Sequence, residues 1–200
     1  SRPAIMDAMR TATFPVVFLI LGLCGGCATQ SGTQSVEVLD QATGMTVASL
    51  KEPIELLPGV QNVPLARGKR ATFAYLGPVE WDSMGTITYG LWVHIAPGND
   101  RQAADIHAPS ALTLNLDDGP LELAPMDAPK LGREPYHALV SWGQSGYFNL
   151  PVQALRRMAA SAKLVLAVRA TDGSVIDFSP TQDSRAVLTR YARGRGITGD

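Results

Sequence analysis

The sequence predicts a mainly β domain, an antiparallel β-sandwich with two short helices near the C-terminus. Three observations predict this class. Short runs of alternating apolar and polar residues recur from residue 36 onward, turn-forming residues separate them, and helical periodicity occurs only after residue 150. The sequence shows no internal repeat and no second domain boundary. We therefore expect residues 36–200 to form a single β-rich domain.

The first strands are expected on either side of a short turn. Residues 36–39 and 45–50 flank Ala42-Thr43-Gly44, a composition that suits a hairpin. Residues 53–57 then read as a further short strand, and a loop rich in Pro and Gly follows in residues 58–69.

The clearest strand signal lies in residues 86–96, TITYGLWVHIA. Its apolar residues occupy every second position, which is typical of a strand that buries one face. The buried face would carry Ile87, Tyr89, Leu91, Val93 and Ile95, and the other face Thr88, Gly90, Trp92 and His94. The preceding run, 71–79, is expected to pair with it through Ser83-Met84-Gly85.

The next strands are also predicted in pairs. Residues 112–116 and 121–123 flank Asp117-Asp118-Gly119-Pro120, in which Asp-Gly is a turn signal. After a Pro-rich loop in residues 124–135, residues 138–142 and 147–150 are expected to pair around Gly143-Gln144-Ser145-Gly146.

Two helices interrupt the β pattern. Pro151 suits a first helical position, and an apolar stripe follows at Ala154, Leu155, Met158 and Ala162. After strands in 164–168 and 175–178, Ser179 and Gln182 have the spacing of a capping box. The closing helix would bury Val187, Leu188 and Tyr191 and end at Gly194. Together these elements favour an immunoglobulin-like or similar sandwich.

The N-terminal residues indicate export. Arg10 precedes the apolar run FPVVFLILGL in residues 14–23, and Gly25-Gly26 supplies the small residues that a signal peptidase needs. A membrane-spanning helix needs about 20 apolar residues, and this run is shorter. It is therefore predicted to be a cleaved signal segment.

Cys24-Gly25-Gly26-Cys27 resembles the lipobox of bacterial lipoproteins, although Cys24 stands where Leu is usual. The resemblance implies that residues 1–27 are a lipoprotein signal peptide and that Cys27 carries the lipid, palmitate included. It also implies an outer-membrane anchor facing the periplasm, because Ala28 stands where an inner-membrane retention Asp would be. Residues 28–35, ATQSGTQS after Cys27, then read as a flexible tether.

Composition excludes several functional classes. Of 17 Lys and Arg, Arg2 and Arg10 precede Cys27, which leaves 15; of 18 Asp and Glu, Asp7 precedes it, which leaves 17. A balance of −2 without a clustered basic surface argues against nucleic-acid binding. Because both cysteines lie in the export segment, the fold must rest on burial alone, and no thiolate metal site is expected in the domain.

The histidines offer little chemistry. His94 is interpreted as a half-buried structural residue in mid-strand, and His137 as a structural residue at a strand start. His107 follows Asp105 at a spacing of two, and two adjacent ligands do not make a catalytic zinc site. Gly143-Gln144-Ser145-Gly146-Tyr147 lacks the glycine that a nucleophile elbow needs two places after the serine. We therefore predict no catalytic residue, no metal site and no cofactor.

Three other groups have both a structural and a functional interpretation. Asp117-Asp118 is a carboxylate pair or, as we favour, part of a turn. The cluster of Arg190, Arg193 and Arg195 is read as cations at a helix C-terminus, with contact to anionic lipid or cell-wall polymer as the alternative. Trp81, Trp92 and Trp142 are read as buried aromatics, with a binding groove as the alternative.

Beyond the lipobox, three stretches are similar to a group of uncharacterised proteobacterial lipoproteins: LDQATGMTV in 39–47, LGPVEWDSMG in 76–85 and YGLWV in 89–93. The resemblance implies an envelope location and no active residues. We therefore expect a non-enzymatic envelope lipoprotein that binds or supports an envelope protein or a cell-wall component. The alternative is a small periplasmic hydrolase or ligand-binding enzyme that uses His94, His107 or Asp105.

Overall fold

A computed structural model of the chain describes residues 35–59, 72–98, 111–138, 140–169, 173 and 175–197. These residues belong to one compact unit, residues 32–200. The predicted signal peptide with Cys27, the tether up to residue 34, Asp105 and His107 all lie outside the described residues. The strands are β1 (Ser35–Asp40), β2 (Met45–Leu50), β3 (Ile54–Pro58), β4 (Phe73–Ser83), β5 (Thr86–Ala96), β6 (Leu112–Leu116), β7 (Gly119–Leu123), β8 (Gln144–Asn149), β9 (Leu164–Arg169) and β10 (Val175–Pro180). The helices are α1 (Val152–Ala160) and α2 (Ser184–Gly194).

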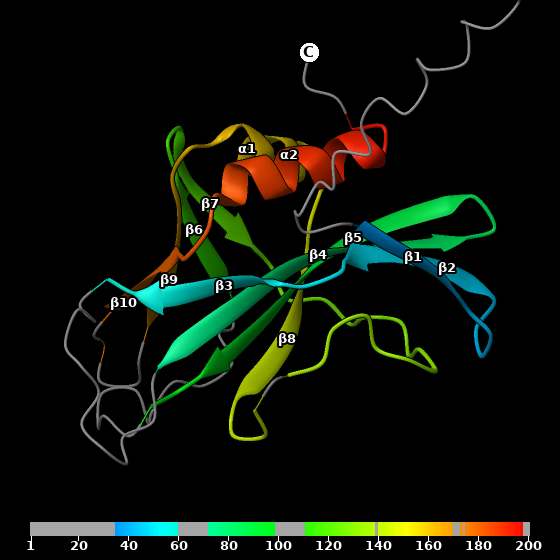
Figure 1. Cartoon of the computed structure of the whole chain (residues 1–200), viewed down its shortest axis with the longest axis horizontal. Coiled ribbons are helices and arrows are strands. Elements are labelled where there is room, and N and C mark those ends of the chain that lie inside the picture. The colour runs from blue at the N-terminus through cyan, green and yellow to red at the C-terminus, as the bar shows by residue number, and fades with distance from the viewer. Residues whose placement is uncertain are drawn as a thin grey trace, which may run out of the picture. The chain divides into compact units, whose positions relative to one another are not determined.

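The structure confirms a mainly antiparallel β fold with two short helices near the C-terminus (Figure 1). All ten strands belong to one sheet, in the order β1-β2-β4-β3-β10-β9-β6-β7, with β5 paired to β4 and β8 paired to β5. The segment after β7 returns to β8, because the Met126 amide donates to Tyr147 O at 2.9 Å and the Asn149 amide to Ala124 O at 2.8 Å. The strands formed by the described residues therefore belong to one continuous sheet.

Strand β4 is the centre of this sheet. One edge of β4 pairs along its whole length with β5, from Phe73 opposite Ala96 to Ser83 opposite Thr86. Its other edge is shared, because β3 pairs with its first half and β2 with its second half. The predicted hairpins β1–β2, β4–β5 and β6–β7 are all confirmed.

The predicted inward face of β5 is confirmed at Leu91, Val93 and Ile95, which are buried. It is wrong at Ile87, which is 51% exposed near the hairpin turn, and Tyr89 is only partly buried. On the opposite face Trp92 is buried, as the sequence favoured, and His94 is fully buried rather than half-buried as expected. The reason is the covering segment, residues 124–138 and 140–143, which packs over this face through Met126 and Tyr136. Figure 1 shows it on the opposite side of β4 and β5 from the helices.

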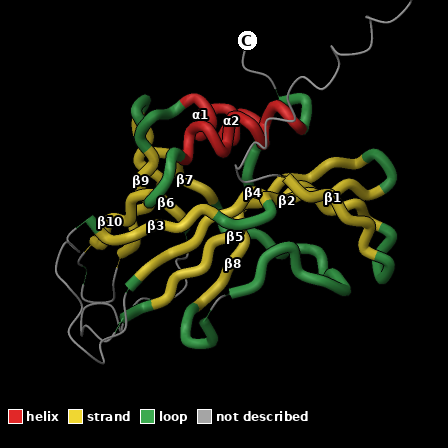
Figure 2. The backbone as a smooth tube through the Cα atoms, in the orientation of Figure 1, coloured by secondary structure: helices red, strands yellow, loops and turns green. Residues whose placement is uncertain are grey.

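The two helices lie side by side on one side of the sheet (Figure 2). Helix α1 buries Ala154, Leu155, Met158 and Ala159, and helix α2 buries Val187, Leu188, Tyr191 and Ala192. Helix α2 is tied to the sheet because the Tyr191 hydroxyl donates to Ala48 O at 3.2 Å. Neither helix formed by the described residues has the length and apolar character that crossing a membrane requires.

Two helix details differ from the predictions. Ala162 is exposed beyond the end of α1, which stops at Ala160. The cap of α2 is Asp183 rather than Ser179, since Asp183 Oδ1 accepts a hydrogen bond from the Ala186 amide at 3.0 Å. Ser179 is held instead in β10, opposite Leu57 of β3, so strand pairing overrides the local capping signal.

The predicted pairing of residues 138–142 with 147–150 is wrong. Strand β8 pairs with β5, with Trp92 opposite Tyr147 and His94 opposite Ser145. The described residues of 138–142 form no strand. Turn composition indicates where the chain reverses, but the partner of β8 lies about fifty positions earlier in the sequence, beyond the reach of local pattern.

Candidate functional site

The most distinctive feature of the domain is an aromatic face on β4, β5 and β8. Residues directly opposite each other in an antiparallel sheet share a face, which brings side chains from three strands together. Consecutive ring contacts run along it: Phe73 with Tyr75 at 5.3 Å, Tyr75 with His94 at 6.4 Å, His94 with Trp92 at 5.9 Å and Trp92 with Tyr136 at 5.1 Å between centroids. We call this set of five rings the aromatic row.

Tyr136 closes one end of the aromatic row. Its hydroxyl donates to Pro78 O and accepts from the Leu50 amide, both at 2.9 Å. Its ring lies on Gly77, where any Cβ would overlap the ring atoms. Burial raises the pKa of Tyr136 well above its ordinary value, so the hydroxyl stays neutral and acts as a hydrogen-bonding group.

His94 lies in the middle of the row and is 1% exposed. Its Nδ1 is 2.9 Å from Ser145 Oγ on β8. Its Nε2 is buried and has no hydrogen-bond partner among the described residues. Gly143 lies against this side of the ring, so closely that a Cβ there would overlap it. Burial lowers the pKa of His94 and favours the neutral imidazole.

A serine beside an imidazole is half of a nucleophilic site. In such sites the second ring nitrogen is held by a carboxylate or a similar acceptor, which stabilises the charged imidazolium. Here Gly143 covers that side of the ring, and the lowered pKa of His94 opposes formation of the imidazolium. The His94–Ser145 pair is therefore suited to joining β5 to β8 rather than to activating Ser145.

Of the residues named for the enzymatic alternative, His94 alone lies in the described part of the chain. Asp105 and His107 lie outside the described residues, and His137 is exposed. In the part of the chain that is described, no group of three or more His, Cys, Asp or Glu side chains could hold a metal ion. Sequence reasoning missed the contact of Ser145 with His94, because no local pattern links positions 51 residues apart.

The three tryptophans do not line one groove. Trp81 and Trp92 are buried, as we favoured from the sequence, and Trp81 packs on Tyr147 with ring centroids 5.5 Å apart. Gly90 gives Trp81 the room to do so, because a Cβ at Gly90 would come 2.5 Å from the Trp81 ring. For Trp142 the prediction of a buried aromatic is wrong, because it is 40% exposed in the covering segment.

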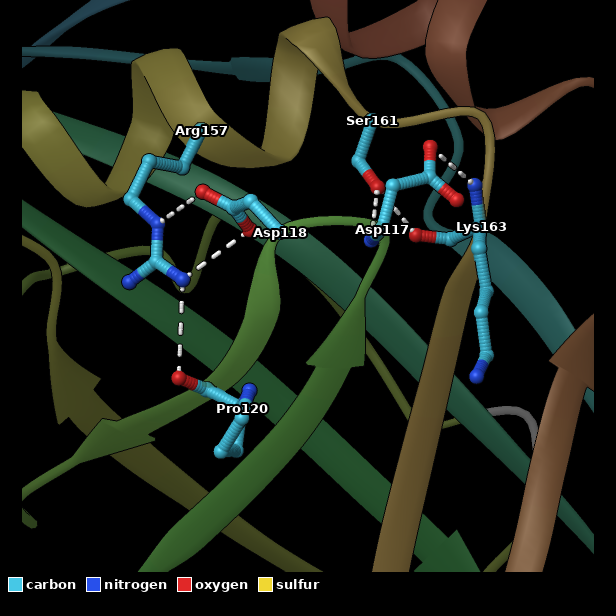
Figure 3. A network of polar contacts seen from close by, with 6 residues as sticks. All are labelled: Asp117, Asp118, Pro120, Arg157, Ser161 and Lys163. Carbon is cyan, nitrogen blue, oxygen red and sulfur yellow. Dashed lines mark hydrogen bonds and ion pairs between the residues drawn. The ribbon is translucent and has the colours of Figure 1, made fainter.

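The Asp117-Asp118 pair has the structural role that the sequence favoured (Figure 3). Asp117 accepts hydrogen bonds from the Ala162 and Lys163 amides at 2.6 and 3.2 Å, which lowers its pKa. Asp118 forms a two-bond ion pair with Arg157 of α1, at 2.7 and 3.0 Å, and this pair lowers the pKa of Asp118. The β6–β7 turn thereby holds the C-terminal end of α1.

The predicted arginine cluster is divided. Arg190 and Arg193 are exposed on α2, whereas Arg195 turns inward. Arg195 Nη1 lies 2.7 Å from Glu37 of β1 and 3.5 Å from the largely buried Glu80 of β4. Burial disfavours the guanidinium charge, but the two carboxylates more than offset it and raise the pKa of Arg195. Arg195 thus links the C-terminal end of α2 to β1 and β4.

The β4–β5 turn exposes a large apolar side chain in an unusual backbone. Met84 is fully exposed and has a φ of 52°, next to Gly85 with a φ of 88°. Asp82 Oδ1 holds the turn by accepting from the Gly85 amide at 2.7 Å. Ile87, just beyond the turn, is about half exposed. We call Met84 and Ile87 the hairpin tip.

Comparison of the chain with protein-family models, with curated proteins and with solved structures finds no match in any of the three.

Proposed function

We propose that this chain is a lipid-anchored protein of the bacterial cell envelope, with a non-enzymatic role in binding or supporting another envelope component. The anchor would be Cys27, in the outer membrane and facing the periplasm. The sequence supports this part through Arg10, the apolar run in 14–23 and Gly25-Gly26 before Cys27. The β domain would then be the part that meets the partner.

The observation that carries the binding role is Met84. The left-handed backbone of a tight hairpin turn favours Gly, Asn or Asp, and an ordinary side chain there costs about 1–2 kcal/mol. The domain nevertheless places a methionine at that position and exposes it completely. Strain of this kind is kept where it serves a purpose, and a flexible thioether is well suited to an adaptable apolar contact.

The hairpin tip also has the geometry of a protruding contact. Ile87, near the start of β5, adds a second exposed apolar side chain close to Met84 in the sequence, and the hydrogen bond from the Gly85 amide to Asp82 holds the turn. A rigid apolar tip loses little conformational freedom when a partner covers it. We infer that the partner offers an apolar recess to Met84 and Ile87.

The enzymatic alternative has less support. His94 is the one histidine of that hypothesis in the described residues, and it is packed within the aromatic row with its pKa lowered. A general base must reach the proton that it removes. The position of Nε2 against Gly143 is better suited to packing than to proton transfer.

The anchor is tested by fractionating cells that express the full chain. Cys27→Ser should release the protein from membranes, because serine cannot carry the thioether-linked lipid, and several acyl chains anchor a domain firmly at about 0.8 kcal/mol for each buried methylene. Cys24→Ser should leave the protein in the membrane fraction. Release by Cys24→Ser alone would show that Cys24 and not Cys27 carries the lipid. Retention of both variants in the membrane fraction would indicate that residues 14–23 are an uncleaved anchor.

The binding role is tested with Met84→Asn, which suits the left-handed turn and removes the apolar contact. In-cell cross-linking with formaldehyde should give an adduct with wild-type protein and lose it with Met84→Asn, while thermal stability is kept or raised. Val175→Asn, at an equally apolar exposed position of β10, should keep the adduct. An adduct that survives Met84→Asn and Ile87→Asn together would reject the hairpin tip as the contact.

A further inference from the structure

Strand β1 is an edge of the sheet with unusually little protection. Among the described residues it pairs with β2 alone. Val36, Val38 and Leu39 on this strand are 38%, 47% and 61% exposed. Natural edge strands are usually guarded by lysine, proline, a bulge or free charges, since they offer unpaired backbone groups to other strands. The β1 sequence, SVEVLD, contains neither lysine nor proline.

The two acidic residues of β1 do not guard this edge either. Glu37 is neutralised by Arg195 at 2.7 Å. Asp40 is buried and bound from two sides, by the Thr43 hydroxyl at 2.6 Å and the Gly132 amide at 3.0 Å. The hydrogen bond from Thr43 is the largest of the effects that lower the pKa of Asp40. Both charges are therefore already satisfied within the domain.

From this edge we propose that two copies of the chain pair through β1, as antiparallel neighbours related by a two-fold axis at Val38. A two-fold axis perpendicular to the sheet keeps each side chain on its own side of the sheet, and directly opposite residues also share a side. The axis must therefore pass between the two copies of one residue rather than between two successive positions. With the axis at Val38, Val36 lies opposite Asp40 of the second copy and Glu37 opposite its Leu39. No ionised side chain then faces another of the same sign.

Two registers neighbour this one, and both are disfavoured. An axis at Leu39 would pair only residues 38–40 of β1, whereas the axis at Val38 pairs residues 36–40. An axis at Glu37 would place the two Glu37 side chains directly opposite each other, and like charges in that position destabilise a strand pair. The sequence of β1 is therefore complementary to itself in the register at Val38. This is why we infer a second copy as the occupant of the edge rather than a strand of another protein, and closed two-fold dimers are the commonest assemblies.

The register makes the proposal testable by disulfide cross-linking. Directly opposite Cα atoms in an antiparallel pair are about 4.5–5.5 Å apart, within the range that a disulfide spans. A cysteine at position 38 would meet its own copy. A cysteine at position 36 would be four residues away from its copy along the strands, about 13 Å, which is too far.

The experiment uses the full chain in detergent micelles, in a Cys24→Ser, Cys27→Ser background, so that the added cysteine is the chain's single thiol. On mild oxidation, Val38→Cys should run mostly as a disulfide dimer, whereas Val36→Cys and Ile87→Cys should stay mostly monomeric. Equal cross-linking at all three positions would show association through the apolar N-terminal segment or by collision, and would overturn the proposal. So would a lack of dimer with Val38→Cys.

A second measurement does not depend on oxidation. In sedimentation the unmodified chain should be a dimer, and Val38→Lys should be a monomer because two lysines would meet at the axis. Ile87→Lys, opposite Asp82 on β4 and away from the edge, should remain a dimer. Circular dichroism melting of Val38→Lys checks that the domain is folded. A folded Val38→Lys that is still dimeric would place the interface elsewhere.

Discussion

The ring of Tyr136 rests directly on the Cα of Gly77, and its hydroxyl joins two strands that flank this contact. The Leu50 amide of β2 donates to it and Pro78 O of β4 accepts from it, both at 2.9 Å. A tyrosine 59 residues further along the chain therefore fixes the covering segment against the centre of the sheet. The contact requires a residue without a side chain at position 77.

Gly77→Ala should therefore destabilise the domain. The added methyl group would overlap the Tyr136 ring, which two hydrogen bonds hold in place, and overpacking of a dense core costs about 1–3 kcal/mol. Gly146→Ala in β8 is the matched control, since a Cβ there would be 3.6 Å from the Phe148 ring, an ordinary contact. Urea unfolding of both variants makes the comparison. Equal stabilities would show that the covering segment moves aside easily.

The β4–β5 hairpin shows how far the sequence alone reaches. The alternation in residues 86–96 predicted the inward face of β5 correctly from Leu91 onward, because strand period and burial coincide there. The end of β4 was missed, since Glu80 and Asp82 interrupt the apolar pattern. Glu80 is buried beside Arg195, which comes from the far end of the chain, and no local pattern shows this pairing.

The candidate site was less predictable than the fold. His94 was placed on the correct face but expected to be half-buried, because the covering segment shares no periodicity with β5. Tyr136 was not singled out, although the glycines at 77, 90 and 143 mark where side chains approach the backbone of the sheet. A glycine inside a strong strand pattern was the one available signal for this packing.

Leu91→Ala should cost about 2–5 kcal/mol of unfolding free energy, because Leu91 is fully buried and truncation leaves a cavity. Ile87→Ala is the control on the same strand and face, where the side chain is about half exposed. Its cost should be within about 1 kcal/mol, in proportion to the smaller buried area. Chemical denaturation measures both, and a loss below that of Ile87→Ala would contradict the assigned face of β5.

The stability of the domain should fall on mild acidification because of His94. Burial lowers its pKa in the folded state below the ordinary value of 6.5, so the unfolded chain binds more protons in this range. Stability is then full above about pH 6.5 and declines as the pH falls through that value toward the folded pKa. His94→Gln should flatten this decline between pH 7.5 and 5, whereas His137→Gln, at an exposed site, should keep it.

Proton NMR measures the titration of His94 directly. The His94 ring resonances should titrate with a midpoint below 6.5, unlike a solvated histidine. A midpoint at or above 6.5 would show that Nε2 finds an acceptor in solution, and the assigned packing against Gly143 would then be wrong. Neither histidine variant should change membrane anchoring, so the result does not depend on the proposed function.

Arg195 should contribute far more to the free energy of unfolding through its contact with Glu80 than through its contact with Glu37. Glu80 is largely buried, so Arg195→Met leaves its carboxylate without an opposite charge, and breaking a buried pair in this way costs about 3–5 kcal/mol. Glu37 is half exposed, so Glu37→Gln removes an ion pair that water already screens and should cost less than about 1 kcal/mol.

The double variant Arg195→Met, Glu80→Gln decides whether that cost belongs to an unpaired charge. Removing both charges should recover a large part of the loss from Arg195→Met, because the neutral amide can be buried beside Tyr89 more cheaply than a carboxylate. Burial, followed by the hydrogen bond to Glu80, raises the pKa of Tyr89 to about 12, so its hydroxyl remains neutral and available to either side chain. Thermal or urea unfolding of the two single variants and the double variant completes the cycle. If the double variant is no more stable than Arg195→Met, the arginine acts through the packing of its aliphatic chain between α2 and the sheet, and the charge of Glu80 is tolerated without it.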